Sequence, residues 1–369
     1  MHNGYKRNTF IQLLAIIEMR KVFYWTYLLL IFGCNSTDRN NNPKKEISTI
    51  AFGSCAKQWE KQPIWKEIEK DMPDLFLFIG DAIYGDWDGV NVYEVSAESL
   101  DRDYDKLNAI PEFKEFREKT PILATWDNHD YGKHNGGSEF NKKELTKQHF
   151  LNFFNEPMSS ERYQTPGIYD SKIYGEVGRQ IQIILLDTRW FKSPFKIDSL
   201  STEARKEIGK VGKYTANFDS TATLLGKKQL SWLENELKKD ADVRLICSSI
   251  QVIPNQKGMD EWGNYPLERT QLLEMISNCS GYPIILSGNV HFAEISKLKV
   301  GNRHIYELTS SGLTHVNEKY AKAPNKYRIQ APFIDLNYGL INVNWEDREI
   351  SLTIKGMNKS EKPLYISFD

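Results

Sequence analysis

The chain has 369 residues, 40% of them hydrophobic and 12% aromatic, so it can bury a large core in one big domain or two small ones. Its 48 basic residues nearly balance its 49 acidic ones, and the formal net charge is -1. Because the charges balance, the net charge gives no reason to expect a nucleic-acid partner.

The N-terminal stretch has the pattern of an export signal. Arg20 and Lys21 precede an apolar run that is too short to span a membrane as a helix. The run ends in Ile31-Phe-Gly-Cys34, which resembles a bacterial lipobox, and cleavage of such a signal leaves a lipidated cysteine at the new N-terminus. A plain secretory signal and an uncleaved anchor are the alternatives, and all three export the protein.

This pattern divides the chain into three parts. We expect residues 1–34 to be a signal and lipobox segment with its true start at Met19, and residues 35–46 to be a flexible tether. Residues 47–369 then form a single domain, a monomer with no specific protein partner. A lipidated Cys34 anchors the protein to the membrane at the periplasmic or outer face of the envelope, and the protein is secreted if the lipobox is not used.

The cysteines do not form a disulfide framework in this interpretation. Once Cys34 is lipidated, three of the four cysteines remain. Cys247 and Cys279 lie in or beside apolar segments, where we expect them in the core. Cys55 stands apart from such segments and is a candidate for chemistry.

The first elements of the domain predict a βαβ unit. An apolar run predicts a strand over residues 47–53, helical spacing predicts a helix over 63–70, and an unbroken apolar run predicts a buried strand over 75–79. The two strands of such a unit are parallel. Cys55 and Asp81, which follow these strands, should therefore face the same way.

Further elements follow along the chain. Helical spacing predicts helices over residues 96–108, 112–119, 139–154, 225–239 and 268–278. Short apolar runs predict strands over residues 121–126, 180–187, 243–250 and 283–288. Alternation over residues 304–308 and 339–355 predicts strands of a second sheet or of a closing edge.

Polar residues able to bind metal or phosphate follow several of these apolar strands. They are Cys55, Asp81 with Tyr84, Asn128 with His129, Asp187 with Arg189, and Asn289 with His291. A loop that only has to turn uses Gly, Pro, Ser, Asn or Lys. The use of Cys, Tyr and His at strand ends therefore predicts a common site, because ligands bind at the carboxyl ends of strands in α/β sheets.

The donor types indicate two kinds of metal. A phenol keeps its proton until about pH 10, so Tyr84 can ligate at neutral pH only if a strongly acidic metal removes that proton. Thiolate, phenolate and carboxylate together therefore suggest Fe(III). Amide oxygens and neutral imidazole suit a divalent ion such as Ca, Mn or Zn. Two adjacent metals can clamp a phosphate and activate water for attack.

Two residues are candidates for direct catalytic roles. His129 could donate a proton to the leaving oxygen, and Arg189 could pair with phosphate oxygens through its planar guanidinium. Each has an alternative: His129 bonds a turn carbonyl, and Arg189 forms a structural ion pair with Asp187 that holds a loop. His134 and His315 are weaker candidates for the site.

The strand-end motifs together resemble the alkaline phosphatase D, or PhoD-like, family of metallophosphoesterases. Each motif is weak alone, but they occur in the family's order over residues 47–313. They are Gly53-Ser-Cys55, Gly80-Asp-x-x-Tyr84, Trp126-Asp-Asn-His-Asp-Tyr-Gly132, Leu186-Asp-Thr-Arg189 and Ser287-Gly-Asn-Val-His291. The resemblance implies an α/β fold, a four-layer αββα sandwich with two mixed β-sheets, and a mixed iron–calcium site acting on phosphate esters, often phosphodiesters.

The resemblance also implies roles for single residues. His129 would lie beside the phosphate, and the site would be binuclear or larger, with Fe(III) plus Ca, or Mn or Zn at the divalent position. The implied metal ligands are Cys55, Asp81, Tyr84, Asn128 and His291, and Asn289 stands where the family has a further ligand.

Two residues depart from the family pattern. Asn128 stands where Asp is common, and this change keeps a ligand type that the wider superfamily uses. Asn289 replaces an Asp of the Ser-Gly-Asp-x-His pattern and removes one negative charge. An amide oxygen can still bind metal, but calcium affinity depends on the number of charged ligands. The second metal should therefore bind more weakly or be of another type.

Two functions follow. The first is an exported metallophosphoesterase that hydrolyses phosphodiesters, phosphomonoesters or both with a metal-activated hydroxide. The alternative, suggested by Asn289, is a catalytically weakened family member that binds phosphate ligands at the cell surface.

Overall fold

The computed structural model describes residues 45–368, which fall within one compact unit running from Lys44 to Asp369. The predicted signal segment, Cys34 and residues 35–44 of the predicted tether lie outside the described residues. Within residues 45–368, no helix has both the length and the apolar character needed to cross a membrane.

Two large mixed sheets form the centre of this unit. The first runs in the order β14-β13-β12-β1-β2-β3, with β15 also paired to β13, and the second runs β10-β11-β9-β8-β5-β4. The strands of the first sheet are β1 (Thr49–Gly53), β2 (Leu75–Ile79), β3 (Ile122–Thr125), β12 (Asn337–Asn344), β13 (Glu349–Gly356), β14 (Lys359–Ser360) and β15 (Leu364–Ser367). The strands of the second are β4 (Asp170–Tyr174), β5 (Ile181–Leu185), β8 (Val243–Ser248), β9 (Tyr282–Ser287), β10 (Ala293–Val300) and β11 (Arg303–Ser310).

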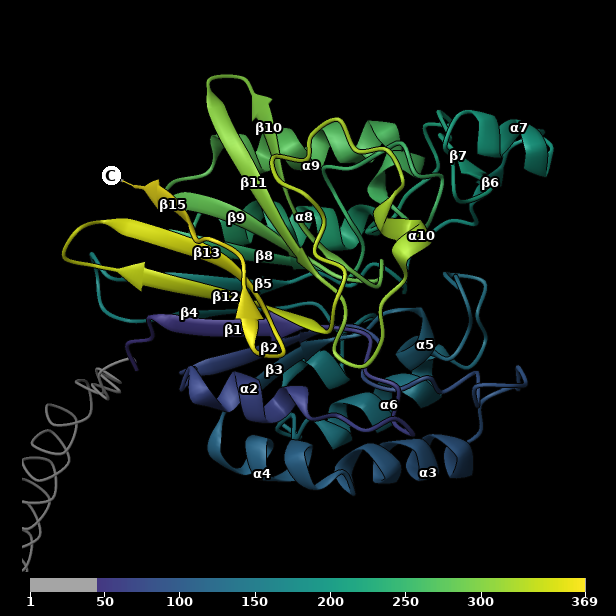
Figure 1. Ribbon diagram of the computed structural model, residues 1–369, viewed down its shortest axis with the longest axis horizontal. Helices are drawn as coiled ribbons and strands as arrows, with labels where there is room; N and C mark the ends of the chain where they lie inside the picture. Colours follow the sequence, from purple (N-terminus) through teal and green to yellow (C-terminus); the bar gives the residue numbers. More distant parts are fainter. Residues whose placement is uncertain (1–44, 369) are drawn as a thin grey trace, which may run out of the picture. The chain divides into compact units, whose positions relative to one another are not determined.

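Helices cover the outer face of each sheet, which gives the four αββα layers seen in Figure 1. The first sheet is covered by α2 (Ile64–Lys70), α3 (Ala97–Asn108), α4 (Pro111–Lys119) and α6 (Lys143–Phe153). The second is covered by α8 (Gly226–Leu237) and α9 (Pro266–Asn278). The short elements are α5 (Asn128–Tyr131), α7 (Thr202–Glu207), α10 (Glu318–Ala321), the 3-10 turns η1 (Glu161–Tyr163) and η2 (Trp262–Asn264), and a ribbon of β6 (Lys196–Ile197) and β7 (Tyr214–Thr215).

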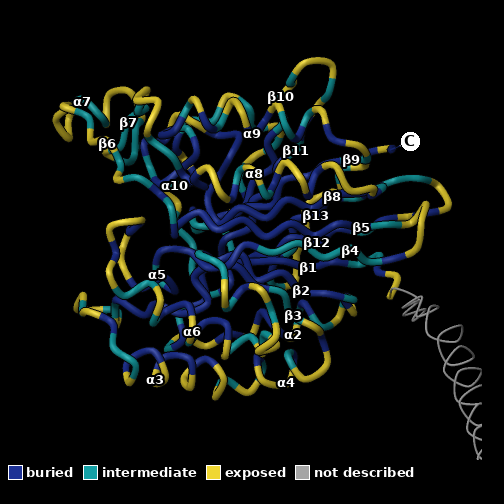
Figure 2. Tube along the Cα trace, turned by 180° about the vertical axis from the view of Figure 1, so that it is seen from behind, coloured by how far each residue is buried: buried dark blue, intermediate teal, exposed yellow. Residues whose placement is uncertain are grey.

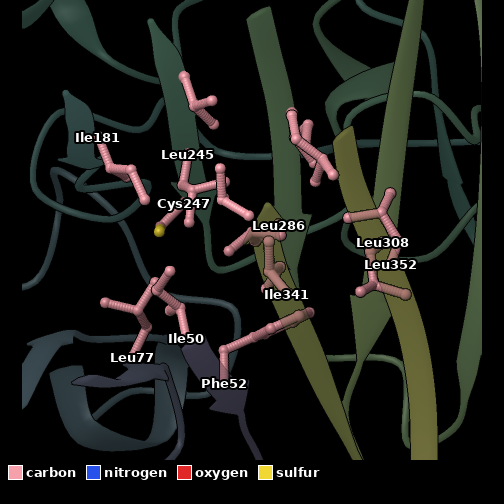
Figure 3. Packing of buried hydrophobic residues seen from close by; sticks show 14 of the residues in the cluster. Ile50, Phe52, Leu77, Ile181, Leu245, Cys247, Leu286, Leu308, Ile341 and Leu352 are labelled. Carbon is pink, nitrogen blue, oxygen red and sulfur yellow. The ribbon is translucent and has the colours of Figure 1, made fainter. Parts of the chain in front are cut away.

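The main core lies between the two sheets. Figure 3 shows Phe52 and Leu77 of the first sheet reaching toward Leu245, Cys247 and Leu286 of the second. Every residue of β2 is buried, because helices cover its other face as well. Figure 2 shows the same pattern along the chain: the strands of both sheets are largely buried and the helices expose their outer sides. The unbroken apolar runs in the sequence therefore reflect burial on both faces.

The direction of the strands places the predicted ligand residues at one edge of each sheet. In the first sheet β1, β2 and β3 are parallel, and in the second β5, β8, β9 and β11 are parallel. Gly80, directly after β2, has φ +98, and a Cβ there would lie 2.5 Å from Cβ of Asp127 after β3. A residue without a side chain is thus required for the two strand ends to approach each other.

The predicted βαβ unit and the predicted sandwich are confirmed, with differences at the edges. The helix predicted over residues 139–154 begins at Lys143. The alternating C-terminal stretches divide between the sheets: β11 pairs with β9, whereas β12 and β13 extend the first sheet beyond β1. The edge strands β4 and β10 were not predicted, because an edge strand is only partly covered and lacks an unbroken apolar run.

Candidate active site

Three predicted ligands converge where the carboxyl edges of the two sheets meet. One ligand atom from each of Cys55, Asp81 and His291 lies within 4.8 Å of the other two. Cys55 Sγ is 3.4 Å from Asp81 Oδ2 and 3.1 Å from Ser311 Oγ. Cys55 and Asp81 follow β1 and β2 of the first sheet, whereas His291 and Ser311 follow β9 and β11 of the second. Both sheets therefore build this cluster.

The backbone of the cluster is held in an unusual conformation. Cys55, Asp81, Asn289 and His291 have φ of 63, 52, 69 and 58, although none is a glycine. Such left-handed residues cost about 1–3 kcal/mol each and persist only where the surroundings hold them. Here Cys55 N–H donates to Gly80 O at 3.2 Å, and His291 N–H donates to Ser311 Oγ at 3.0 Å. The bonds hold strained residues in place at the sheet ends.

Asp130 braces two of the loops that carry these residues. Its buried carboxylate accepts from the N–H groups of Asp81 at 2.5 Å, Ile83 at 3.1 Å and Asp127 at 3.0 Å. Asp81 and Ile83 follow β2, and Asp127 follows β3. Asp130 therefore fixes the loop of the predicted ligands Asp81 and Tyr84 against the turn that begins α5.

His129 is oriented by carboxylates on two sides. Its backbone N–H donates to Asp81 Oδ1 at 3.1 Å, and its Nδ1 lies 2.6 Å from Asp86 Oδ1. Burial by itself lowers the pKa of His129, but the negative charge of Asp81 and the hydrogen bond to Asp86 reverse this effect and raise the pKa above its ordinary value. These contacts hold the ring in one orientation, as a proton donor requires.

Tyr84 connects the cluster to His315. Its buried hydroxyl lies 3.3 Å from His315 Nε2, and its ring centroid is 4.2 Å from that of His129. The ring of His315 in turn lies 4.3 Å from that of His291. The structure thus brings His315, a weak candidate in the sequence, into contact with the predicted ligands.

The electrostatics of the cluster fit a bound cation. Burial raises the pKa of the Cys55 thiol and of the Asp81 carboxyl, and it lowers the pKa of His291 to about 3. Neutral imidazole is the form that ligates metals, and a nearby cation favours thiolate and carboxylate. Thiol, carboxylate and imidazole are a donor set that a transition metal accepts.

A cavity of about 250 Å³ opens beside the cluster. Asn128, His129, Asn289 and His291 line it, and so does Asp260 of the loop before η2. The Asn289 Nδ2 lies 3.5 Å from the backbone oxygen of Asp260. Within the described part of the chain the Asn289 side-chain oxygen accepts no hydrogen bond, so this atom is available to a cation. His134 also lines the cavity, with its ring 5.7 Å from that of His129.

Arg189 does not lie in this cavity, contrary to the prediction that it contacts phosphate. Its side chain is 0% exposed, and its guanidinium is clamped between the carboxylates of Asp127 and Asp260, the latter at 2.5 Å. Asp187 binds backbone N–H groups of Arg189 and Trp190 and the indole of Trp126 instead. Arg189 is thus in a structural ion pair, as the alternative held, but with different partners.

Sequence reasoning missed several supporting residues. Asp130 stands three residues after Asp127 at a helix start, which is the spacing of a capping box and could have revealed its role. Ser311 follows the predicted strand now seen as β11, so the strand-end argument could have found it. Asp86 has no sequence signal beyond its nearness to Tyr84.

Comparisons with known proteins agree with this geometry. The family model of the PhoD-like phosphatases matches residues 50–333, which run from β1 through β11. A search of the curated proteins finds no match. The solved structure of PhoD aligns with a TM-score of 0.66 at 18% identity, over 88% of this chain and 69% of that one. TT1561 of Thermus thermophilus aligns over 83% of this chain and 98% of that one, at 10% identity and a TM-score of 0.39.

These findings bear on fold and chemistry in different ways. At 18% identity, the alignment with PhoD shows a shared fold. The family match covers most of the chain and includes each strand end that carries a predicted ligand, so it supports phosphoester hydrolysis as the chemistry of the site. The chain belongs to the PhoD-like phosphatase family.

Proposed function

We propose that this phosphoesterase depends on a metal site built around Cys55, Asp81 and His291, and that it hydrolyses phosphodiesters, phosphomonoesters or both. The observation that carries the proposal is the approach of a buried thiol, carboxylate and imidazole to within 4.8 Å of one another. These groups have lost their water through burial, and a bound cation would compensate for the free energy that this loss costs.

The donors divide by chemistry. Cys55, Asp81 and Tyr84 offer the thiolate, carboxylate and phenolate that suit Fe(III), and His291 is near enough to the first two to join them. Asn128 and Asn289 offer amide oxygens to calcium or to another divalent ion such as Mn or Zn. When bound, the metals would clamp the phosphate and supply hydroxide for in-line attack.

The residues of the chain then perform the proton transfer. Asp86 holds Nδ1 of His129, so Nε2 would be the ring nitrogen that carries the proton for the leaving oxygen. Tyr84 packs against the same ring and limits its rotation. Asp130 holds the Asp81 loop against the turn that carries His129 during the proton transfer.

Turnover of two chromogenic esters tests the proposal. The purified protein is loaded with iron and calcium and assayed with 4-nitrophenyl phosphate and with bis(4-nitrophenyl) phosphate. We expect hydrolysis of at least one ester, loss of turnover on chelation, and recovery when the metals are restored. A loaded, folded protein that cleaves neither ester would contradict the proposed function.

Asn289 motivates a second candidate, a surface protein that binds phosphate ligands with little turnover. The amide lines the cavity where the family pattern has a carboxylate, so the divalent position has one negative charge fewer. The variant Asn289→Asp separates the two functions. A large gain in turnover would indicate a weakened site, whereas little change would indicate a site adapted to the amide.

We also propose that the protein is anchored in the cell envelope through a lipidated Cys34. The support is the lipobox-like Ile31-Phe-Gly-Cys34 after a short apolar run. Growth with labelled palmitate should mark the wild-type chain and not the variant Cys34→Ser. Equal labelling of both chains would contradict the anchor.

A further inference from the structure

A separate excursion forms part of the cavity wall. The segment 194–217, which we call the strap, lies within the connection between β5 and α8 and contains β6, α7 and β7. Its two strands pair only with each other and join neither large sheet. The strap projects from the same side of the unit as α5 and α10 (Figures 1 and 2). The overall sandwich does not require such an excursion, which leaves its role open.

The strap is fastened to the loop before η2 by main-chain contacts. The N–H of Gly212 donates to Lys257 O at 2.9 Å, and the N–H of Tyr214 donates to Gly258 O at 2.8 Å. A Cβ on Gly212 would collide with the backbone of Gly258, so only glycine allows this approach. Asn135 Nδ2 also donates to the Tyr214 hydroxyl at 2.8 Å. Lys213, between the two anchored residues, therefore has a fixed main chain.

Lys213 is a cation at the cavity without an anionic partner. Gly212, Lys213 and Tyr214 line the same cavity as the predicted ligands Asn128, Asn289 and His291. Two other cations of the strap are neutralised, because Asp198 pairs with Arg205 at 2.8 Å and with Lys210 at 2.5 Å. Lys213 forms no ion pair within residues 45–368.

The carboxylate that lines the cavity is already paired. Asp260 lines the cavity, but its buried carboxylate is paired with Arg189, which also binds Asp127. Tyr214 and Tyr320, both half-buried, complete this part of the wall. The strap side of the cavity thus carries the exposed Lys213, whose ammonium lies 6.0 Å from the ring centroid of Tyr214, whereas the strand-end side carries Asn128, Asn289 and His291.

We propose that Lys213 forms a subsite for a second anionic group, so that the preferred ligand carries a further phosphate, phosphonate or carboxylate besides the phosphoryl group at the strand ends. This proposal rests on the proposed function, which places the first phosphoryl group beside Asn128, His129 and His291. A lysine ammonium is a point charge with three donors, which suits such a group. A cavity of about 250 Å³ favours a small ligand.

Binding of two matched, non-hydrolysable probes tests the subsite without requiring turnover. Propylphosphonate carries one anionic group, and propane-1,3-diyl bisphosphonate carries a second at the end of the same carbon chain. Calorimetry with the metal-loaded full chain should show that the wild type prefers the bisphosphonate by about fivefold, the range of a partly exposed ion pair. Lys213→Ala should lose this preference, and Lys213→Arg should retain it.

The control comes from the same strap. Lys206 lies exposed on α7 and does not line the cavity, so Lys206→Ala should keep the preference of the wild type. Equal affinity of the wild type for the two probes, a preference that survives Lys213→Ala, or no binding of either probe would overturn the subsite. A protein that hydrolyses nitrophenyl esters but shows no preference would overturn the subsite and leave the proposed function standing.

Discussion

Replacing Arg189 with methionine tests whether this residue is structural or binds substrate. The substitution keeps an unbranched apolar side chain and removes the guanidinium with its charge. It leaves two carboxylates, Asp127 and Asp260, facing each other with side-chain exposures of 1% and 3%. The pKa of Asp127 is already raised to about 7, mainly because of burial, although the charge of Arg189 opposes this rise.

The expected cost follows from this burial. Breaking a buried ion pair by removing one partner costs about 3–5 kcal/mol, because the remaining charge is left uncompensated. A domain is typically stable by about 5–15 kcal/mol, so Arg189→Met should remove a large fraction of that stability. Adding Asp127→Asn and Asp260→Asn to the same chain should recover much of the loss, because no unpaired charge then remains.

Urea unfolding of the metal-free protein measures these differences. Arg179→Met is the matched control, because Arg179 is 50% exposed in a surface pair with Glu46 at 3.4 Å and should change stability by less than about 1 kcal/mol. The reasoning is refuted if Arg189→Met unfolds at the urea concentration of the wild type while KM for a phosphate ester rises several-fold. That result would place Arg189 on the substrate.

Three further predictions concern the site. Cys55→Ala should lose most of the bound iron in elemental analysis, whereas Cys247→Ala, in the core between the sheets, should keep it. Asp130→Asn should lower the free energy of unfolding by about 2 kcal/mol and reduce kcat, because one amide oxygen cannot accept all three N–H bonds; unchanged values would remove its bracing role. Asp86→Asn should move the alkaline limb of the pH–rate profile to lower pH. The raised pKa of His129 keeps it protonated above its usual range, and this variant removes part of the cause; an unmoved limb would contradict His129 as the proton donor.

The parts of the fold that the sequence predicts are those buried on both faces. The run Leu75–Ile79 is apolar throughout because sheet and helices cover both its sides, and such a run leaves few other interpretations. The convergence of Cys55 and Asp81 follows from the parallel βαβ unit that connects them. His291 was expected at the same site because it also follows an apolar strand, although no local rule states how the two sheets meet.

The remaining features depend on contacts between distant segments. Asp187 is the sequence neighbour of Arg189, yet the guanidinium binds Asp127 and Asp260, which come from two other loops. The side chain of Asp187 is instead used by nearby N–H groups and by the indole of Trp126. Sequence spacing cannot distinguish these arrangements, because any of the three carboxylates could satisfy a buried arginine.

Anomalous diffraction at the iron absorption edge, from crystals grown with iron and calcium, tests the central claim most directly. We predict an iron peak bonded to Cys55 Sγ and Asp81, with His291 beside it. The absence of an iron peak at this position, with the Cys55 thiol still hydrogen-bonded to Ser311 and Asp81, would contradict the metal site on which the proposed function rests.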